Sequence, residues 1–353
     1  MRRFRFHPCG NFYDNYEQQL KIFETDFGRL WLVIFLCGLF GILPFILSPY
    51  ALYVLNRIGI AAVAVIGLNL LMGYTGQISL GHGAFFGVGA YAAAIMATRA
   101  KLPFLVSVPL AGLMTALVGL VFGIPSGRLK HLYLTIATLA GQFIIEYVLI
   151  HWESLTQGTM GIILPEANLW GFVLEGDRSF YVIIYLFLVF LAWVAANLVR
   201  SKFGRAFAAI RDNDRAAAGM GIPLFAYKLL AFAISSFYAG AAGGLWAYYT
   251  MSITPEPFNL WLSIEYIAMV IIGGLGSIVG SIYGAVFITM LNETLGWVTE
   301  ALMNIGAMGV TIAPLREFFF GLVIVLFIIF EPKGLAEVWR IVRASFRLWP
   351  FSY

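Results

Sequence analysis

The chain has 353 residues, of which 61% are hydrophobic and only 11% are charged, with a formal net charge of +4. An ordinary soluble domain carries about 25% charged residues, and a soluble protein of this size could not bury so much apolar surface. The composition therefore excludes a soluble domain and indicates an all-α polytopic membrane protein. The two cysteines, Cys9 and Cys37, provide no disulfide framework.

Residues 1–29 are polar and mixed in charge, which predicts an amino-terminal arm on the cytoplasmic side and no cleavable signal peptide. Apolar runs then follow one another as far as residue 330. They cover 30–49, 52–72, 73–98, 104–122, 132–150, 179–199, 225–250, 261–284, 285–307 and 318–330. The sequence therefore predicts about ten transmembrane helices within residues 30–331 and a tail over 332–353.

The positions of Lys and Arg predict the orientation of these helices. The basic residues gather in the amino-terminal arm, in 123–131, in 201–223 and in the tail. With ten spans these four segments lie on one side, which the positive-inside rule makes cytoplasmic, and the acidic 151–178 loop lies outside. Both termini are therefore predicted to be cytoplasmic. Arg57 fits this scheme less well, and we expect it to reach the interface from a helix end.

Glycine is concentrated in 73–89 and in 273–284. Small residues let membrane helices pack closely, and glycine also permits a helix to break where its backbone lines a cavity. Close packing explains most single glycines, but the first group is interspersed with polar residues, which favours a broken helix near a pathway. If the chain consists of two five-helix halves, the odd number makes them inverted repeats.

Polar side chains at membrane depth are the first candidates for a substrate pathway. In the first Gly-rich stretch these are Thr75, Gln77, Ser79 and His82. A broken helix presents N–H and C=O groups that suit the carboxylate and ammonium of a zwitterion. The alternative is that these side chains only satisfy local backbone groups, and this is the simpler account of His82.

The acidic residues near the ends of the apolar runs have a simpler interpretation. Glu146 and Glu265 fit outer helix ends at the membrane interface, and Asn292 and Glu293 fit the border of the ninth helix. An ion-driven secondary transporter would need a buried charged pair within its spans, and the apolar runs offer little of that kind.

The sequence contains no arrangement typical of an enzyme. The four histidines are scattered, with no carboxylate pair or cysteine at a useful spacing, and there is no phosphate-binding loop. We therefore predict neither catalysis nor a directly bound cofactor or metal, and if ATP is used, another subunit must bind it.

The largest polar interruption on the predicted cytoplasmic side is SKFGRAFAAIRDNDRAAAGMGIP, residues 201–223. Gly204 and Gly219 bracket a short amphipathic helix with an apolar and a charged face. The residues concerned are Arg205, Phe207, Ile210, Arg211, Asp212, Asp214 and Arg215. Such a helix usually contacts a soluble partner; the alternative is a helix that lies on the lipid headgroups.

Four stretches resemble a known family. They are GLNLLMGYTGQISLGHGAFFGVGAYAAA (67–94), GRAFAAIRDNDRAAAGMGIPLFAYKLLAFAISSFYAGAAGGLWA (204–247), GGLGSIVGSIYGAVF (273–287) and FEPKGL (330–335). In this order they resemble the permease subunits of ABC importers for branched-chain amino acids, urea and related small solutes, and in particular the second permease type.

The resemblance implies an inner-membrane assembly of this chain, a sister permease, two ATP-binding subunits and a periplasmic binding protein, without nucleic acid. It also implies that 204–222 holds the coupling helix that docks on an ATPase. The loop departs from the family pattern because Asp214–Arg215 stand where a Glu usually precedes the Ala run. A branched-chain or other amino acid is the expected substrate, with urea or a short amide as the alternative.

Overall fold

The computed structural model describes residues 26–127, 132–169, 172–174, 176–304, 312–331 and 333–348. Most of these residues are helical, and the strands among them are only two residues long, so the predicted all-α class is confirmed. Six of the described helices are long and apolar enough to cross a membrane. They are α4 (Pro49–Thr75), α6 (Phe104–Gly123), α7 (Leu132–His151), α9 (Gly176–Arg200), α12 (Leu224–Thr250) and α14 (Ile278–Asn304).

The other apolar helices of the described chain are shorter or bent. Three are apolar helices of 10 to 17 residues: Leu30–Ile46, α5 (His82–Thr98) and α13 (Leu260–Gly273). The first of these runs through α2 (Asp26–Cys37), the π-helix η1 (Gly38–Ile42) and α3 (Leu43–Ile46). Helices α15 (Ile312–Phe330) and α16 (Leu335–Leu348) are bent by 45° and would make a seventh span if counted together. The described residues thus confirm several membrane-spanning helices but not the full set of ten.

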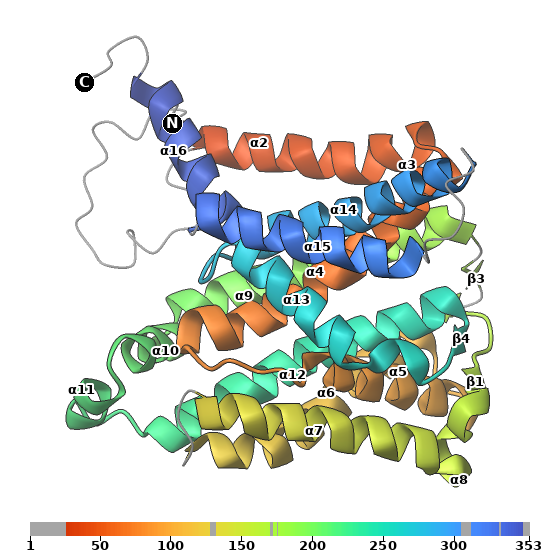
Figure 1. Cartoon of the computed structure of the whole chain (residues 1–353), viewed down its shortest axis with the longest axis horizontal. Helices are drawn as coiled ribbons and strands as arrows, with labels where there is room; N and C mark the ends of the chain where they lie inside the picture. The colour runs from red at the N-terminus through yellow and green to blue at the C-terminus, as the bar shows by residue number, and fades with distance from the viewer. Residues whose placement is uncertain are drawn as a thin grey trace, which may run out of the picture.

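Helix α12 lies at the centre of the bundle and packs against α4, α5 and α6 (Figure 1). Glycines let these backbones approach closely. A Cβ atom on Gly89 of α5 would lie 2.3 Å from the Gly240 Cα atom of α12, and one on Gly243 would lie 2.0 Å from the Phe86 carbonyl oxygen. Close helix packing therefore accounts for these glycines.

The first Gly-rich stretch breaks a helix, as the sequence predicts. Helix α4 ends at Thr75, the chain is non-helical from Gly76 to Gly81, and α5 starts at His82. Gly76 has a φ of +69°, the left-handed conformation that glycine adopts without strain at a helix end.

The second Gly-rich stretch corrects the predicted boundary between the eighth and ninth helices. The sequence places this boundary at 284/285, but α13 ends at Gly273 and α14 begins at Ile278. Gly274 and Gly276 have positive φ values of 118° and 77°, so the turn needs the glycines that the sequence analysis assigned to the end of a continuous helix. Asn292 and Glu293 consequently lie inside α14 and not at its border.

The loop between α7 and α9 contains short elements: α8 (Glu153–Thr156), the 3-10 turn η3 (Gly158–Met160), β1 (Ile162–Ile163), β2 (Asn168–Leu169) and β3 (Phe172–Val173). Strand β1 pairs antiparallel with β4 (Ser252–Ile253), with Ile162 opposite Ile253, and β2 pairs with β3. The remaining short elements are the 3-10 turns η2 (Ile124–Gly127) and η4 (Glu256–Phe258).

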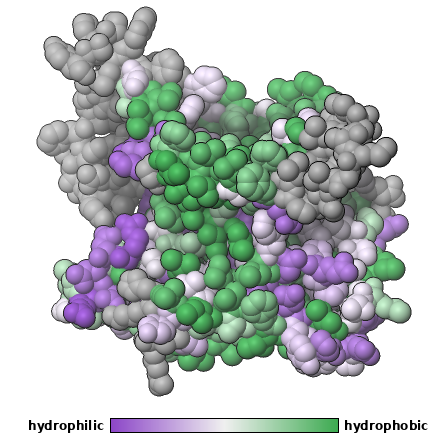
Figure 2. Space-filling model, viewed as in Figure 1, coloured by the Kyte–Doolittle hydropathy of each residue, from purple (hydrophilic) through white to green (hydrophobic). Residues whose placement is uncertain are grey.

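The two ends of the bundle carry different elements (Figure 1). Helices α10 (Lys202–Asp212) and α11 (Asp214–Gly219) project at the left, and α8 with β1 and β4 lies at the right. Figure 2 shows apolar residues across the middle of this face and polar residues at both of these ends. This distribution matches a bundle that crosses the membrane from left to right in the view. Below, the α10–α11 end is called the inner end and the α8 end the outer end.

Candidate functional site

The four predicted pathway residues are all buried, with exposed fractions between 1% and 4%. Thr75 Oγ1 donates to the Leu71 carbonyl at 2.5 Å and accepts from Gln77 Nε2 at 3.0 Å. Ser79 Oγ accepts from the Gly81 N–H at 3.4 Å, and His82 Nε2 lies 2.9 Å from the Ala64 carbonyl oxygen. Thr75 and Ser79 thus satisfy backbone groups close to them in the chain, the alternative that the sequence left open. Gln77 binds a side chain and its buried Oε1 has no hydrogen-bond partner among the described residues, and His82 contacts α4.

The start of α5 is capped by side chains that the sequence analysis did not single out. The Gly83 N–H donates to Ser263 Oγ at 2.7 Å, and the Ala84 N–H donates to Gln142 Oε1 at 2.8 Å. Gln142 is fully buried and also donates to the Phe258 carbonyl at 2.8 Å. Because α13 and α7 occupy these N–H groups, this helix end does not offer them to a substrate carboxylate. The sequence signals Gln142 only as the one Gln in the middle of a largely apolar run.

A buried asparagine joins the two Gly-rich stretches. Asn69 of α4 donates through Nδ2 to the carbonyls of Gly274 and Ser277 at 3.3 and 2.8 Å, and to Ser281 Oγ at 2.8 Å. Its Oδ1 accepts from the Gly276 N–H at 2.9 Å. One side chain thus holds the α13–α14 turn against α4, close to the point where α4 ends.

The predicted coupling segment consists of two helices and not one. Helix α10 begins after Ser201, whose Oγ accepts from the Phe203 N–H, and α11 begins after Asn213, whose Oδ1 accepts from the N–H groups of Arg215 and Ala216. Gly204 lies inside α10, where a Cβ atom would be 1.9 Å from the Val199 carbonyl oxygen. Glycine is therefore needed for the tight turn from α9 into α10.

The two faces of this segment have different roles in the structure. Phe207 and Ile210 are buried at 0% and 4% exposure, and Phe207 packs edge-on against Tyr227, so the apolar face anchors α10 to the bundle. Arg205, Asp212, Arg215 and Gly219 are exposed, Asp214 is half-buried, and Met220 is 79% exposed at the end of α11. A partner would meet these side chains and not the apolar face.

Arg211 links the coupling segment to the broken helix. Its Nη1 donates to the Gly73 carbonyl of α4 at 2.9 Å, while its Nε donates to Asp212 at 3.1 Å. A cavity of about 260 Å³ lies between the two regions and is lined by Thr75 and Gln77 on one side and by Asp212 and Asp214 on the other. The structure therefore places two of the predicted pathway residues beside the predicted coupling residues. We call Asn69, Gly73, Arg211 and Gly276 the inner junction.

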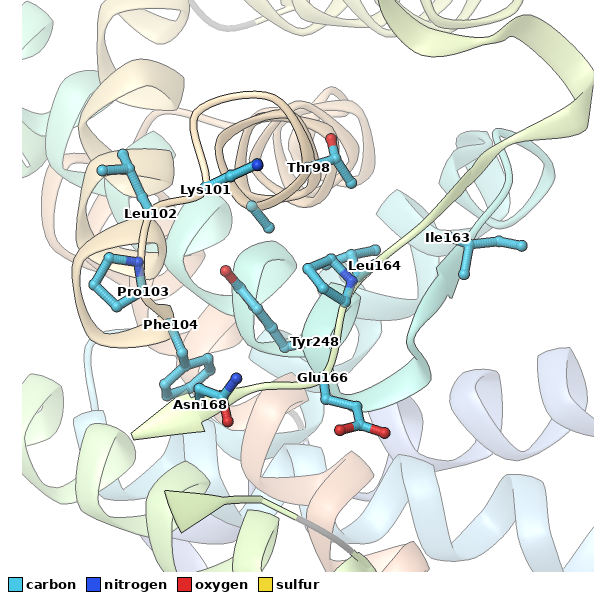
Figure 3. Close-up of a pocket in the computed structure, with 12 residues that line it drawn as sticks. Thr98, Lys101, Leu102, Pro103, Phe104, Ile163, Leu164, Glu166, Asn168 and Tyr248 are labelled. Carbon is cyan, nitrogen blue, oxygen red and sulfur yellow. The ribbon is translucent and has the colours of Figure 1, made fainter. Parts of the chain in front are cut away.

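At the outer end a cavity of about 720 Å³ opens between the α5–α6 turn and the 163–168 segment. Figure 3 shows Tyr248 between these two segments, with Lys101 on one side and Glu166 on the other. Lys101 has a φ of +50°, which a non-glycine residue rarely adopts.

Three charged residues that the sequence placed at helix ends or interfaces have partners on neighbouring helices. Arg57 Nη1 lies 2.6 Å from Glu293 Oε1, with side chains 40% and 18% exposed. Glu265 Oε1 accepts from Asn292 Nδ2 at 2.6 Å. The interfacial placement of Arg57 and Glu265 stays a prediction, but the helices do contain a part-buried charged pair, which Tyr50 at the start of α4 joins by donating to Glu293 Oε2 at 2.8 Å. Its members lie 236 residues apart, so no local pattern could indicate it.

These features define a polytopic helical membrane protein with a broken helix in its interior, an architecture that serves membrane transport. Residues 50–328 match the family described as branched-chain amino acid transport system, permease component. The chain belongs to this family. It is a permease component and not itself an enzyme.

Curated relatives agree with the family. The chain is 30% identical over 324 residues to the high-affinity branched-chain amino acid transport system permease protein LivM of Salmonella typhimurium. The matched region covers 84% of this chain and 72% of that relative. It is 30% identical over 322 residues to LivM of Escherichia coli K12, with the same coverage. It is 26% identical over 302 residues to the autoinducer 2 import system permease protein LsrC of Photorhabdus luminescens, and the match covers 78% of this chain and 84% of that relative. No solved structure gives a significant match.

Proposed function

We propose that the chain is the M-type permease of an ATP-driven importer that moves a branched-chain amino acid across the inner membrane. The observation that carries this proposal is the family match over residues 50–328, which includes the α10–α11 segment and both Gly-rich breaks. The relatives with 30% identity are named for branched-chain amino acids. Urea or a short amide as the substrate is therefore not favoured.

In this proposal the inner end is cytoplasmic, with both termini on that side, and the shorter apolar helices and the bent pair complete about ten spans. The exposed end of α10–α11 docks on one of two ATP-binding subunits, which hold the ATP, so no cofactor binds this chain directly. A sister permease and a periplasmic binding protein complete the assembly. Two inverted five-helix halves remain a hypothesis for the internal organisation.

The inner junction supports a mechanical role for the docked segment. Arg211 bonds the end of α10 to Gly73, one turn before the break that follows Thr75, and Asn69 bonds the same turn of α4 to the α13–α14 turn. Because each contact joins a side chain of one helix to the backbone of another, a displacement of α10–α11 by the ATPase moves both breaks together. Thr75 and Gln77 line the cavity between the first break and the α10–α11 segment and form the inner end of the pathway.

Co-purification from mild detergent tests the docking surface. Met220 is 79% exposed beyond α11 and Met160 is 91% exposed in the outer loop, so Asp replaces each without disturbing a packed core. We expect ATP-binding subunits to co-purify with the unchanged chain and with Met160→Asp, and to be lost with Met220→Asp, because a charge is costly in a buried interface core. Absence of ATP-binding subunits from the unchanged assembly would refute the proposed function, and their equal recovery with both variants would refute the docking surface.

A further inference from the structure

Charged side chains from three helices meet in the outer half of the bundle, although they lie far apart in the sequence. Arg57 lies about 12 Å along α4 from its first residue at a rise of about 1.5 Å per residue, and it pairs with Glu293 of α14. Glu265 of α13 is held by Asn292 of α14. Ionisable groups within membrane spans are costly, and they typically mark the path of a polar substrate.

A cavity of about 240 Å³ lies beside these groups, between α4, α5, α12, α13 and α14. Arg57 and Glu265 line it from α4 and α13, so a cation and an anion both face the same space. Drug-sized ligands occupy pockets of roughly 300–1,000 Å³, so this cavity suits a smaller molecule.

Four aromatic side chains form the apolar part of the cavity wall. Phe86 lies with its ring centre 6.1 Å from that of Trp246, 6.0 Å from Phe258 and 5.8 Å from Tyr266. Trp246 and Phe258 lie 5.4 Å apart in an edge-on contact. These rings form one packed surface and not isolated side chains. The predicted pathway residue His82 packs edge-on behind Tyr266 at 5.9 Å, so it supports the wall and does not line the cavity.

We propose that this cavity is a binding site for a small zwitterion with an apolar side chain, occupied as the substrate crosses the bundle. This inference rests on the proposed function, and it assigns the substrate class to residues of this chain. Arg57 binds the carboxylate, Glu265 binds the ammonium group, and the aromatic wall contacts the aliphatic side chain.

The donor and acceptor sets fit such a ligand. A guanidinium has five N–H donors, so Arg57 can hold Glu293 and a second carboxylate together. A carboxylate accepts through two oxygens, so Glu265 can accept from Asn292 and from an ammonium group. With Glu293 included, the three charged side chains carry a net charge of −1, and Arg57 and Glu293 already offset one another. The charge left over is that of Glu265, which an ammonium group offsets, and Arg57 remains the group that can hold a carboxylate of the same ligand.

ATP-driven uptake by the complete importer in proteoliposomes tests the site, with radiolabelled L-leucine as the probe. Glu265→Gln keeps an oxygen that accepts from Asn292 and removes the charge. We expect the apparent KM for leucine delivery to rise, or the maximal uptake rate to fall, by about ten-fold, as is typical for the loss of one charge-assisted hydrogen bond. The matched control is Glu146→Gln, because Glu146 of α7 does not line this cavity, and its uptake should equal that of the unchanged importer.

The outcomes separate this inference from the proposed function. If the unchanged importer shows no ATP-driven uptake, the proposed function fails. If it imports leucine and Glu265→Gln imports it equally well, the proposed function stands and the binding site is refuted. Stimulation of ATP hydrolysis by the leucine-loaded binding protein shows whether the Glu265→Gln assembly is intact.

A labelling experiment tests occupancy directly and does not depend on transport. Cys9 and Cys37 are replaced by Ser in the complete importer, and Leu262, which lines the cavity, by Cys. We expect L-leucine to slow maleimide labelling of Leu262→Cys several-fold, and 4-methylpentanoate and 3-methylbutylamine, which each lack one charged group, to protect less. Val286→Cys, on an exposed part of α14, should show no protection. Equal labelling of Leu262→Cys with and without leucine would overturn the proposal.

Discussion

Replacing Asn69 with Ala should destabilise the protein more than any other single polar change in α4. The substitution removes four hydrogen bonds, to Gly274, Gly276, Ser277 and Ser281, and leaves buried backbone groups of the α13–α14 turn without this partner. A single hydrogen bond contributes about 0.5–1.5 kcal/mol net, and a buried group left unpaired costs about 1–3 kcal/mol. Allowing for non-additivity among bonds of one side chain, we expect a loss of about 3 kcal/mol.

The same helix offers a matched control. Asn56 is also fully buried in α4, but the backbone group that its Nδ2 binds is a single carbonyl, that of Asp177 at 3.0 Å. Asn56→Ala should therefore cost about 1 kcal/mol. Thermal unfolding of the purified protein in detergent measures the difference: the midpoint for Asn69→Ala should fall by several degrees more than that for Asn56→Ala. Equal midpoints for the two variants would refute the role assigned to Asn69.

Three further predictions concern packing, helix capping and coupling. Gly89→Ala places a methyl group against the Gly240 backbone and should cost about 1–3 kcal/mol, measured as a lower unfolding midpoint, whereas Gly321→Ala, with nothing within 4 Å of the new Cβ, should not lower it. Gln142→Leu leaves the Ala84 N–H and the Phe258 carbonyl without this partner and should cost about 2 kcal/mol in the same assay; an unchanged midpoint would contradict this. Arg211→Ala removes the hydrogen bond to Gly73 and should lower the uptake per ATP hydrolysed by about ten-fold, while the ATP-binding subunits still co-purify. An unchanged ratio of uptake to hydrolysis would show that this contact does not couple the two.

The sequence predicts the broken helix but not what surrounds it. The combination of Gly76 with Thr75 and Gln77 marks the break because only a few residue types end a helix inside an apolar run. The partners of the start of α5 come from α7 and α13, more than 50 residues away. Such contacts depend on which helices become neighbours, and helical periodicity within one segment carries no information about that.

The charged residues illustrate the same limit more sharply. In the sequence Arg57 and Glu293 each look like an isolated charge near a helix end, where an interfacial position is the simplest interpretation. In the structure the two form an ion pair that joins α4 to α14. The two faces of the α10–α11 segment were easier to predict because an amphipathic pattern is local: the apolar face is buried and the charged face is largely exposed. The break at Asn213 was missed, although Asn is a preferred residue before a helix start.

The most direct test of the central claim is ATP-driven uptake of leucine by proteoliposomes that contain the permeases, the ATP-binding subunits and the binding protein. The account predicts accumulation that requires ATP, that persists with Met160→Asp and that is lost with Met220→Asp. Accumulation that continues without ATP and follows a proton or sodium gradient would contradict it, because the Arg57–Glu293 pair would then belong to an ion-coupled transporter.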